Sequence, residues 1–132
     1  MGGGLPKLKL HPVNGETFTL GGVAVTPFDI IHGELTILGY KLNNCAYITD
    51  CSGIPDETKE QLQDLDILIL NALGFAPHPT HFSLSQALAT VEELKPRRTI
   101  FTHINHKFDH ETVSAELPEG VELAYDGMVV EN

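Results

Sequence analysis

Short apolar runs separated by turn residues fill the first third of the chain, and the pattern then changes to strands that alternate with helices. The first pattern predicts a meander of antiparallel strands, because alternating β-type runs bounded by Gly and Asn form hairpins. The predicted strands are residues 7–10, 17–20, 23–28, 36–42 and 46–49, with Asn14-Gly15 and Gly21-Gly22 as turns.

Two helices are predicted in the second part. Pro55-Asp56-Glu57 suits the first turn of a short helix, since proline fits the first helical position and acidic side chains favour the positive end of the helix dipole. Ser83 and Gln86 have the spacing of a capping box, and apolar residues then recur at helical intervals over residues 84–94. Lys95-Pro96 ends this second helix.

The remaining apolar segments predict buried strands and a mixed α/β fold. Residues 67–70 and 99–102 are unbroken apolar or β-prone runs of the kind that are buried on both faces of a sheet. Residues 121–125 and 128–131 predict a closing hairpin around Asp126-Gly127. We expect residues 1–132 to form a single structural unit, a layered mixed sheet with helices on one face, in which residues 1–4 are a flexible leader.

Composition and charge limit the partners of this chain. With 132 residues, 42% of them apolar and 20% charged, it is long enough to bury a core and is expected to be folded. The formal net charge of -10 would repel the phosphate backbone of nucleic acids, so no nucleic-acid partner is expected. A bound divalent cation reverses the charge locally, so a small phosphorylated substrate remains compatible with this charge.

The sequence also bears on location. No apolar run reaches the about 18 residues that a membrane span needs, and no secretion signal precedes the first predicted strand. Cys45 and Cys51 are the only cysteines, which fits a reducing compartment. We therefore expect a cytoplasmic protein without a membrane partner, in which both cysteines are small buried groups.

Histidines and one aspartate follow the ends of four predicted strands. These residues are His32, Asp50, His78, His81 and His103. Strand ends in layered α/β folds lie along one edge of the sheet, where loops can converge on a ligand. Imidazole and carboxylate together are the ligands of hydrolytic centres with one or two metal ions, in which bound water becomes a nucleophile at neutral pH. Taken singly, His32 also fits a hydrogen-bonded loop residue and Asp50 a turn residue.

Four segments containing these residues resemble the metallo-β-lactamase-fold hydrolases. They are F-D-I-I-H-G (28–33), Y-I-T-D-C-S-G-I-P (47–55), P-H-P-T-H-F-S (77–83) and F-T-H-I-N-H (101–106). Within that family the chain is most similar to the group of the bacterial phosphoribosyl cyclic phosphodiesterase, because H-P-T-H-F-S with this spacing is specific to the group. The resemblance runs from about residue 13 to residue 130.

The resemblance implies a metal centre with up to two divalent ions, zinc or manganese. His32 would bind the first ion, Asp50 would bridge both ions, and His103 would bind the second. His81 would face the phosphate of the substrate as a general acid, and His78 would belong to the same surface. The implied activity is that of a phosphodiesterase-like hydrolase.

One motif of the family has no counterpart. Members carry an H-x-H-x-D-H motif upstream of the first matching segment, whereas the only histidine before His32 is His11. The chain thus matches the C-terminal half of the family fold, and we expect its apolar sheet face to meet a second copy or a complementary N-terminal half. The alternative function is a catalytically incomplete half-domain, an assembly module or a remnant, because the H-x-H-x-D-H motif is absent. A nucleophilic hydrolase is not supported, because no G-x-S-x-G motif occurs.

Overall fold

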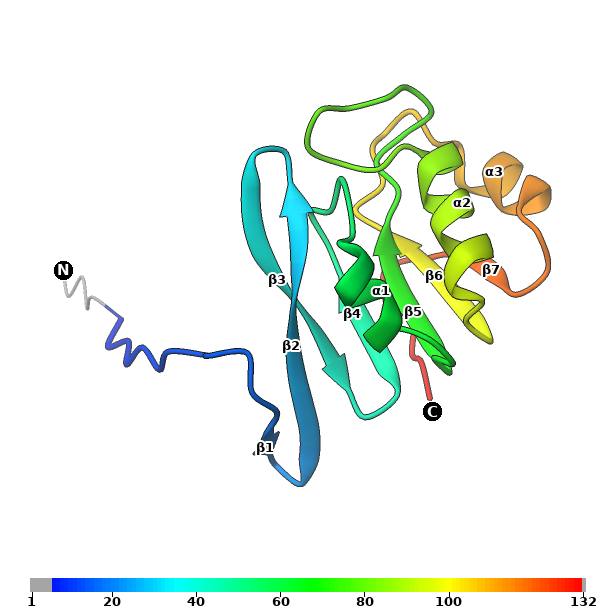
Figure 1. Ribbon diagram of the computed structural model, residues 1–132. Coiled ribbons are helices and arrows are strands. Elements are labelled where there is room, and N and C mark those ends of the chain that lie inside the picture. The colour runs from blue at the N-terminus through cyan, green and yellow to red at the C-terminus, as the bar shows by residue number, and fades with distance from the viewer. Residues whose placement is uncertain (1–5, 132) are drawn as a thin grey trace, which may run out of the picture.

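The computed structural model describes residues 6–131 and contains one mixed sheet whose strands follow one another in chain order (Figure 1). The strands are β1 (Phe18–Leu20), β2 (Val23–His32), β3 (Leu35–Leu42), β4 (Cys45–Ile48), β5 (Ile67–Asn71), β6 (Arg98–Thr102) and β7 (Val121–Leu123). The helices are α1 (Asp56–Gln61), α2 (Leu84–Leu94) and α3 (His110–Glu116). The predicted mixed α/β fold is confirmed, while the predicted leader at residues 1–4 lies outside the described residues.

The direction of the strands decides where their ends lie. Strands β1 to β4 pair antiparallel, and β4 to β7 pair parallel. Because β2 and β4 both run opposite to β3, β2 points the same way as β4, β5 and β6. The carboxyl ends of these four strands therefore lie along one edge of the sheet.

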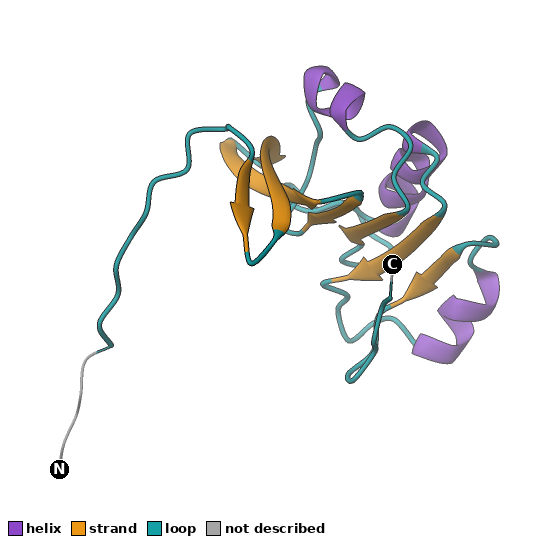
Figure 2. Cartoon of the chain, turned by 90° about the horizontal axis from the view of Figure 1, so that it is seen from below, coloured by secondary structure: helices purple, strands orange, loops and turns teal. Residues whose placement is uncertain are grey.

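The core lies between one face of the sheet and the helices. Ile48, Leu70 and Phe101 come from three adjacent strands and are fully buried in one cluster, to which side chains of α2 and α3 also belong. Figure 2 shows α1 and α2 on the same side of the sheet. The Ser83–Gln86 capping box begins α2, as predicted. Burial of this face is the main stabilising contribution, because each fully buried aliphatic side chain contributes roughly 1.5–3 kcal/mol.

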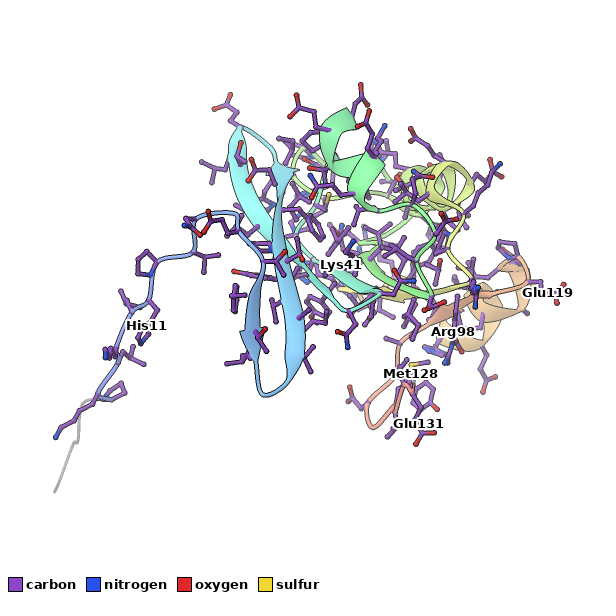
Figure 3. The ribbon with its side chains drawn as sticks, turned by 60° about the horizontal axis from the view of Figure 1, so that its bottom comes forward. His11, Lys41, Arg98, Glu119, Met128 and Glu131 are labelled. Atoms are coloured by element: carbon purple, nitrogen blue, oxygen red, sulfur yellow. The ribbon has the colours of Figure 1, made fainter. Side chains whose placement is uncertain are left out.

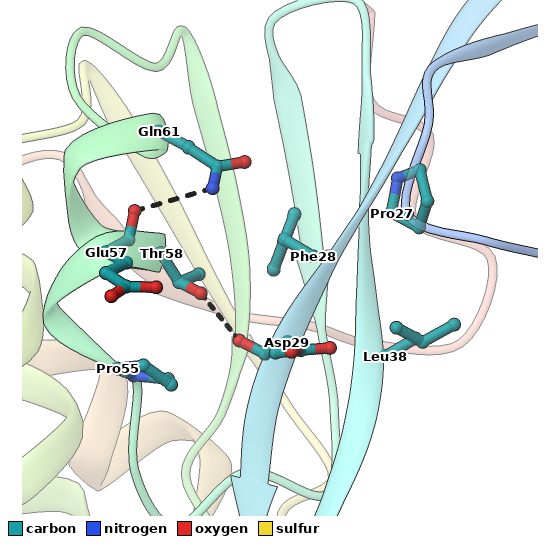
Figure 4. A pocket seen from close by; sticks show the side chains of 9 residues that line it. Pro27, Phe28, Asp29, Leu38, Pro55, Glu57, Thr58 and Gln61 are labelled. Carbon is teal, nitrogen blue, oxygen red and sulfur yellow. Dashed lines mark hydrogen bonds between the residues drawn. The ribbon is translucent and has the colours of Figure 1, made fainter.

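Helix α1 is hydrogen-bonded to strand β2 in addition to packing on the core. The Thr58 hydroxyl donates a hydrogen bond to the Asp29 carbonyl over 2.8 Å (Figure 4). Pro27, Glu57 and Gln61 line a shallow pocket beside this contact. The contact places α1 across the part of β2 that leads to His32.

The opposite face of the sheet is largely apolar over β2 to β5 and carries no helix within residues 6–131. Register pairs such as Tyr40 with Tyr47 and Val25 with Leu42 place their side chains on this face. Tyr47 is 43% exposed and Leu42 is 39% exposed. We call this surface the open face; it consists of Val25, Leu38, Tyr40, Leu42, Tyr47 and Ile69.

Two of the predicted strands are wrong. Residues 7–10 form no strand, and Leu8 and Leu10 are exposed, so that ordering this segment would gain no burial to offset its entropy. Figure 3 shows His11 on the same extended segment, away from the sheet. The predicted closing hairpin is also absent, because β7 pairs parallel to β6 and residues 128–131 are not a strand.

An unpredicted helix explains the error at the C-terminal end. Helix α3 connects β6 to β7, and parallel strands need such a crossover connection. Its signal in the sequence is Asp109, whose side chain accepts a hydrogen bond from the Thr112 backbone N–H over 2.9 Å. Within residues 6–131, none of the three helices has the length and apolar character that a bilayer crossing requires.

A buried amide fixes the loop that follows β4. The Asn71 side chain, at the end of β5, is 0% exposed. It accepts a hydrogen bond from the Cys51 N–H over 2.7 Å and donates one to the Cys51 carbonyl over 2.9 Å. One side chain thus satisfies both backbone groups of the residue after Asp50.

Replacing this amide should destabilise the protein. Asn71→Ala leaves the Cys51 N–H buried without a partner, whereas the Cys51 carbonyl keeps the hydrogen bond from the Phe82 N–H, so we expect the free energy of unfolding to fall by about 2 kcal/mol. The measurement is urea unfolding followed by circular dichroism. Asn44→Ala is the control, because the Asn44 amide also makes two hydrogen bonds but at a partly exposed position, where water replaces them at a cost under about 1 kcal/mol. Equal losses in both variants would contradict the role of Asn71.

Candidate metal centre

Four of the predicted site residues meet at the edge where β2, β4, β5 and β6 end. The Asp50 Oδ1 atom lies 3.0 Å from His81 Nε2 and 3.4 Å from His103 Nε2. The two histidine Nε2 atoms are 3.2 Å apart. Potential ligand atoms of His32, Asp50 and His81 all lie within 4.8 Å of one another. Residues separated by as many as 71 positions in the sequence therefore form one cluster of imidazole and carboxylate groups.

The orientation of His32 leaves one ring nitrogen free. Its Nδ1 atom lies 2.8 Å from the Asp50 carbonyl oxygen and 3.0 Å from the Thr80 carbonyl oxygen. Both partners can only accept, so Nδ1 carries a proton, and in the neutral imidazole Nε2 is then the nitrogen with the lone pair. Histidines that bind metals are oriented in this way by a backbone carbonyl.

Asp50 and His103 both stand in the left-handed backbone region. Their φ angles are 56° and 57°, which residues other than glycine rarely adopt. Such strained positions cluster at functional sites, where the surrounding structure holds them. The hydrogen bond from His81, together with the charge of His103, keeps the pKa of Asp50 below its ordinary value. Asp50 is therefore an anion at neutral pH.

His81 is held on both sides of its ring. Its Nδ1 atom lies 2.8 Å from the Thr80 hydroxyl and 3.2 Å from His78 Nδ1. Its ring stacks on His103 with the centroids 4.9 Å apart. His78 is exposed and contacts His81 rather than Asp50, so it lies at the margin of the cluster.

Backbone hydrogen bonds join the loops that carry these side chains. The loop after β4 returns to β2, where the Ser52 N–H donates to the Ile31 carbonyl over 2.7 Å. The Phe82 N–H donates to the Cys51 carbonyl over 2.7 Å, which joins the loop after β5 to the loop after β4. Gly33 has a φ of +61°, and a Cβ atom there would lie 2.9 Å from Thr80 Cγ2. The loops are thus fixed at short distances from one another.

Cys51 follows Asp50 but is not a ligand candidate. Its thiol is buried and donates to the Gly53 carbonyl over 3.2 Å. Burial raises the pKa of Cys51 to about 11, so the thiol stays protonated and unreactive. The prediction that this cysteine is a small buried group is confirmed, whereas Cys45 is only partly buried.

The donor set fits a divalent cation. Neutral imidazole nitrogen and carboxylate oxygen suit zinc, manganese and related ions, and three such groups with an open position are the usual protein contribution to a catalytic zinc site. His81 lies closer to the expected metal ligands than the sequence predicted, because its Nε2 atom contacts the Asp50 carboxylate directly. The supporting residues Asn71 and Thr80 were not predicted. The only sign of Asn71 in the sequence is that this polar residue directly follows the apolar run of residues 67–70.

The chain is similar to known proteins in sequence and in structure. The family model described as "Beta-lactamase superfamily domain" matches residues 3–104. The octanoyltransferase of Porphyromonas gingivalis is 33% identical over 128 residues, which are 95% of this chain but only 26% of that protein. Its named activity is therefore not assigned to this chain.

Two solved structures share the fold. A diphosphatase of the PhnP family is 45% identical, with a TM-score of 0.88 over 91% of this chain and 47% of that one. Zn²⁺-bound PqqB from Methylobacterium extorquens is 17% identical, with a TM-score of 0.68 over 89% of this chain and 54% of that one. The chain spans about half the length of the structures it matches. With the family model matching most of its length, the chain belongs to the beta-lactamase superfamily and has the metallo-β-lactamase fold.

Proposed function

We propose that this chain supplies the catalytic edge of a metal-dependent hydrolase that cleaves phosphodiester-type bonds. The observation that carries the proposal is the cluster of His32, Asp50, His81 and His103 at one edge of the sheet. The 45% identity to a diphosphatase supports a substrate with a phosphorus–oxygen bond. The small phosphorylated substrate fits the acidic chain because the cation would offset the carboxylate of Asp50.

In this proposal His32, Asp50 and His103 hold up to two divalent ions, zinc or manganese. The cation supplies Lewis acidity and lowers the pKa of water towards neutrality. The Nδ1 hydrogen bonds of His32 leave its Nε2 atom to bind an ion, and the lowered pKa of Asp50 provides the carboxylate anion that binding needs. His103 presents its Nε2 atom to the same carboxylate.

His81 is proposed as the proton donor to the leaving oxygen, with His78 on the same substrate-facing surface. A general acid must lie within hydrogen-bond reach of the reacting group. The Thr80 hydroxyl fixes the Nδ1 side of the His81 ring, so its Nε2 side faces the cluster. The proton would pass from His81 to the oxygen that departs from phosphorus.

The open face is proposed to be covered by a complementary segment that brings further ligands. Two observations support this: the face is apolar, and the chain spans 47% of the diphosphatase it resembles. A second copy of the chain is the other occupant that fits the same chemistry. The alternative function, a half-domain that acts as an assembly module without turnover, is favoured by the same exposed face. Two free cysteines support a cytoplasmic location as part of the proposal.

Removing a proposed ligand should remove metal. We expect Asp50→Asn and His103→Ala to lower bound zinc or manganese well below that of the unmodified protein and to reduce kcat/KM for phosphodiesters at least about 100-fold. Metal is measured per chain by mass spectrometry after dialysis. Asp29→Asn and His110→Ala are matched controls, since Asp29 is exposed on β2 and His110 bonds the Ala124 carbonyl instead. Full metal content in Asp50→Asn would contradict the proposed centre.

The role of His81 can be separated from metal binding. If His81 donates the proton, His81→Ala should lower kcat about 100-fold or more for an alkyl leaving group and much less for p-nitrophenolate, which needs no proton. Bound metal should be unchanged. The measurement compares methyl and p-nitrophenyl phosphodiesters on the same preparation. Loss of metal from His81→Ala would show that His81 is a ligand and would refute the proton-donor role.

The open face should cause association when it is not covered. We expect the mass in solution to exceed the 14.4 kDa of one chain, with binding of the dye ANS to any monomer. Tyr47→Lys with Leu38→Lys should lower both signals. Leu35→Lys is the control, because Leu35 is exposed on the other face of β3. A monomer that binds no ANS would count against any partner on this face.

A further inference from the structure

A pocket of about 250 Å³ lies beside the metal centre, between the loop after β5 and the loop after β6. His78 lines this pocket and also lies 3.2 Å from His81 in the cluster. Figure 1 shows the two loops at the end of the sheet where β5 and β6 finish. The pocket therefore opens next to the position at which a substrate phosphate would meet the metal centre.

The walls of the pocket are held in place by contacts between the two loops. The Asn105 N–H donates to the Leu73 carbonyl over 2.9 Å. A Cβ atom at Gly74 would lie 2.7 Å from Asn105 Nδ2, so the absence of a side chain at Gly74 lets the amide pack against the loop. The Asn105 Oδ1 atom accepts from the Lys107 N–H over 2.9 Å, which fixes the amide. The pocket is therefore formed by packing between the two loops and does not depend on a single side chain.

Phe75 forms an aromatic platform in this pocket. Its ring packs against the buried ring of Phe108 with the centroids 4.7 Å apart, yet 55% of Phe75 is exposed. A phenyl ring that is fixed on one side and open on the other can stack a planar group of a ligand. Pro77 adds a second apolar surface to the same wall.

Polar groups in the pocket suit a ligand that is also anionic. Lys107 lines it, and within residues 6–131 this ammonium makes none of the ion pairs found in the structure. The chain has only 8 Lys and Arg against 18 Asp and Glu, so few cationic side chains are present to pair with an anionic ligand. Attraction between this ammonium and a phosphate at the neighbouring centre would hold the ligand across the two sites.

We propose that this pocket is a substrate subsite that binds an aryl or heteroaryl group esterified to the phosphate. The ring stacks on Phe75, and Lys107 pairs with phosphate or ring oxygens. The inference rests on the proposed function and adds to it a substrate class, namely organic phosphates that carry a planar ring.

The test compares phenylphosphonate with methylphosphonate, which are not hydrolysed and differ only in the ring. We expect the zinc-loaded protein to bind phenylphosphonate about tenfold more tightly by calorimetry, and Phe75→Ala to abolish this difference while methylphosphonate binding stays the same. Phe75→Tyr keeps a ring and should keep the preference. Tyr125→Ala is the matched control, since Tyr125 is an exposed aromatic residue in a separate pocket beside His103.

The outcomes separate this inference from the proposed function. Equal binding of the two phosphonates would overturn the aryl subsite and leave the phosphate site standing. Failure of both to bind would refute the proposed phosphate site, and benzyl alcohol then tests the pocket alone. Chemical-shift changes at Phe75 and Phe108 on adding benzyl alcohol would support the subsite, and their absence would refute it.

Discussion

The shared direction of β2, β4, β5 and β6 is the constraint on which the candidate site depends. Each of these strands ends at the edge where one side chain of the cluster stands, His32 on β2 itself and the other three in the loops that follow β4, β5 and β6. Because β3 runs antiparallel to both β2 and β4, the end of β4 returns to the edge at which His32 lies. If β2 ran the other way, His32 would lie at the opposite edge of the sheet, a full strand length away. The candidate metal centre therefore depends first on the order and direction of the strands and only then on the identity of the side chains.

Strand order brings the loops together, but hydrogen bonds determine which atoms face one another. Asp50 and His103 adopt a left-handed backbone that costs about 1 kcal/mol or more at each position. The amide of Asn71 offsets part of this cost by satisfying both backbone groups of Cys51, and the Asp50 carbonyl itself orients the ring of His32. The same residue thus offers its carboxylate to the cluster and its carbonyl to the neighbouring ligand candidate. Substituting the Asp50 side chain removes the carboxylate but keeps the backbone carbonyl that orients His32.

Much of the fold was predictable because its signals are local. The capping box at Ser83 and the apolar spacing after it predicted α2, and the strand-end positions of His32, Asp50, His81 and His103 predicted the edge at which they meet. The parallel pairing of β7 was missed because it depends on α3, a helix of His110–Glu116 with little apolar periodicity. The contact between His81 and Asp50 and the burial of Asn71 arise from tertiary packing, which no spacing in the sequence reports. Wrong predictions therefore fall where an element is defined by its partner rather than by its own residues.

On β4 the open face ends close to the edge of the sheet at which the candidate metal centre lies. Tyr47 points from the open face on β4, and Asp50 follows three positions later at the end of that strand. A segment that covered Tyr47 would therefore reach the edge at which Asp50 stands, and any ligand groups that it carried would enter the same cluster. Hydrophobic association would position the missing ligands, and metal binding would in turn stabilise the association, because an ion held by both parts binds only the assembled state. On this argument, dilution and chelation should weaken the assembly together.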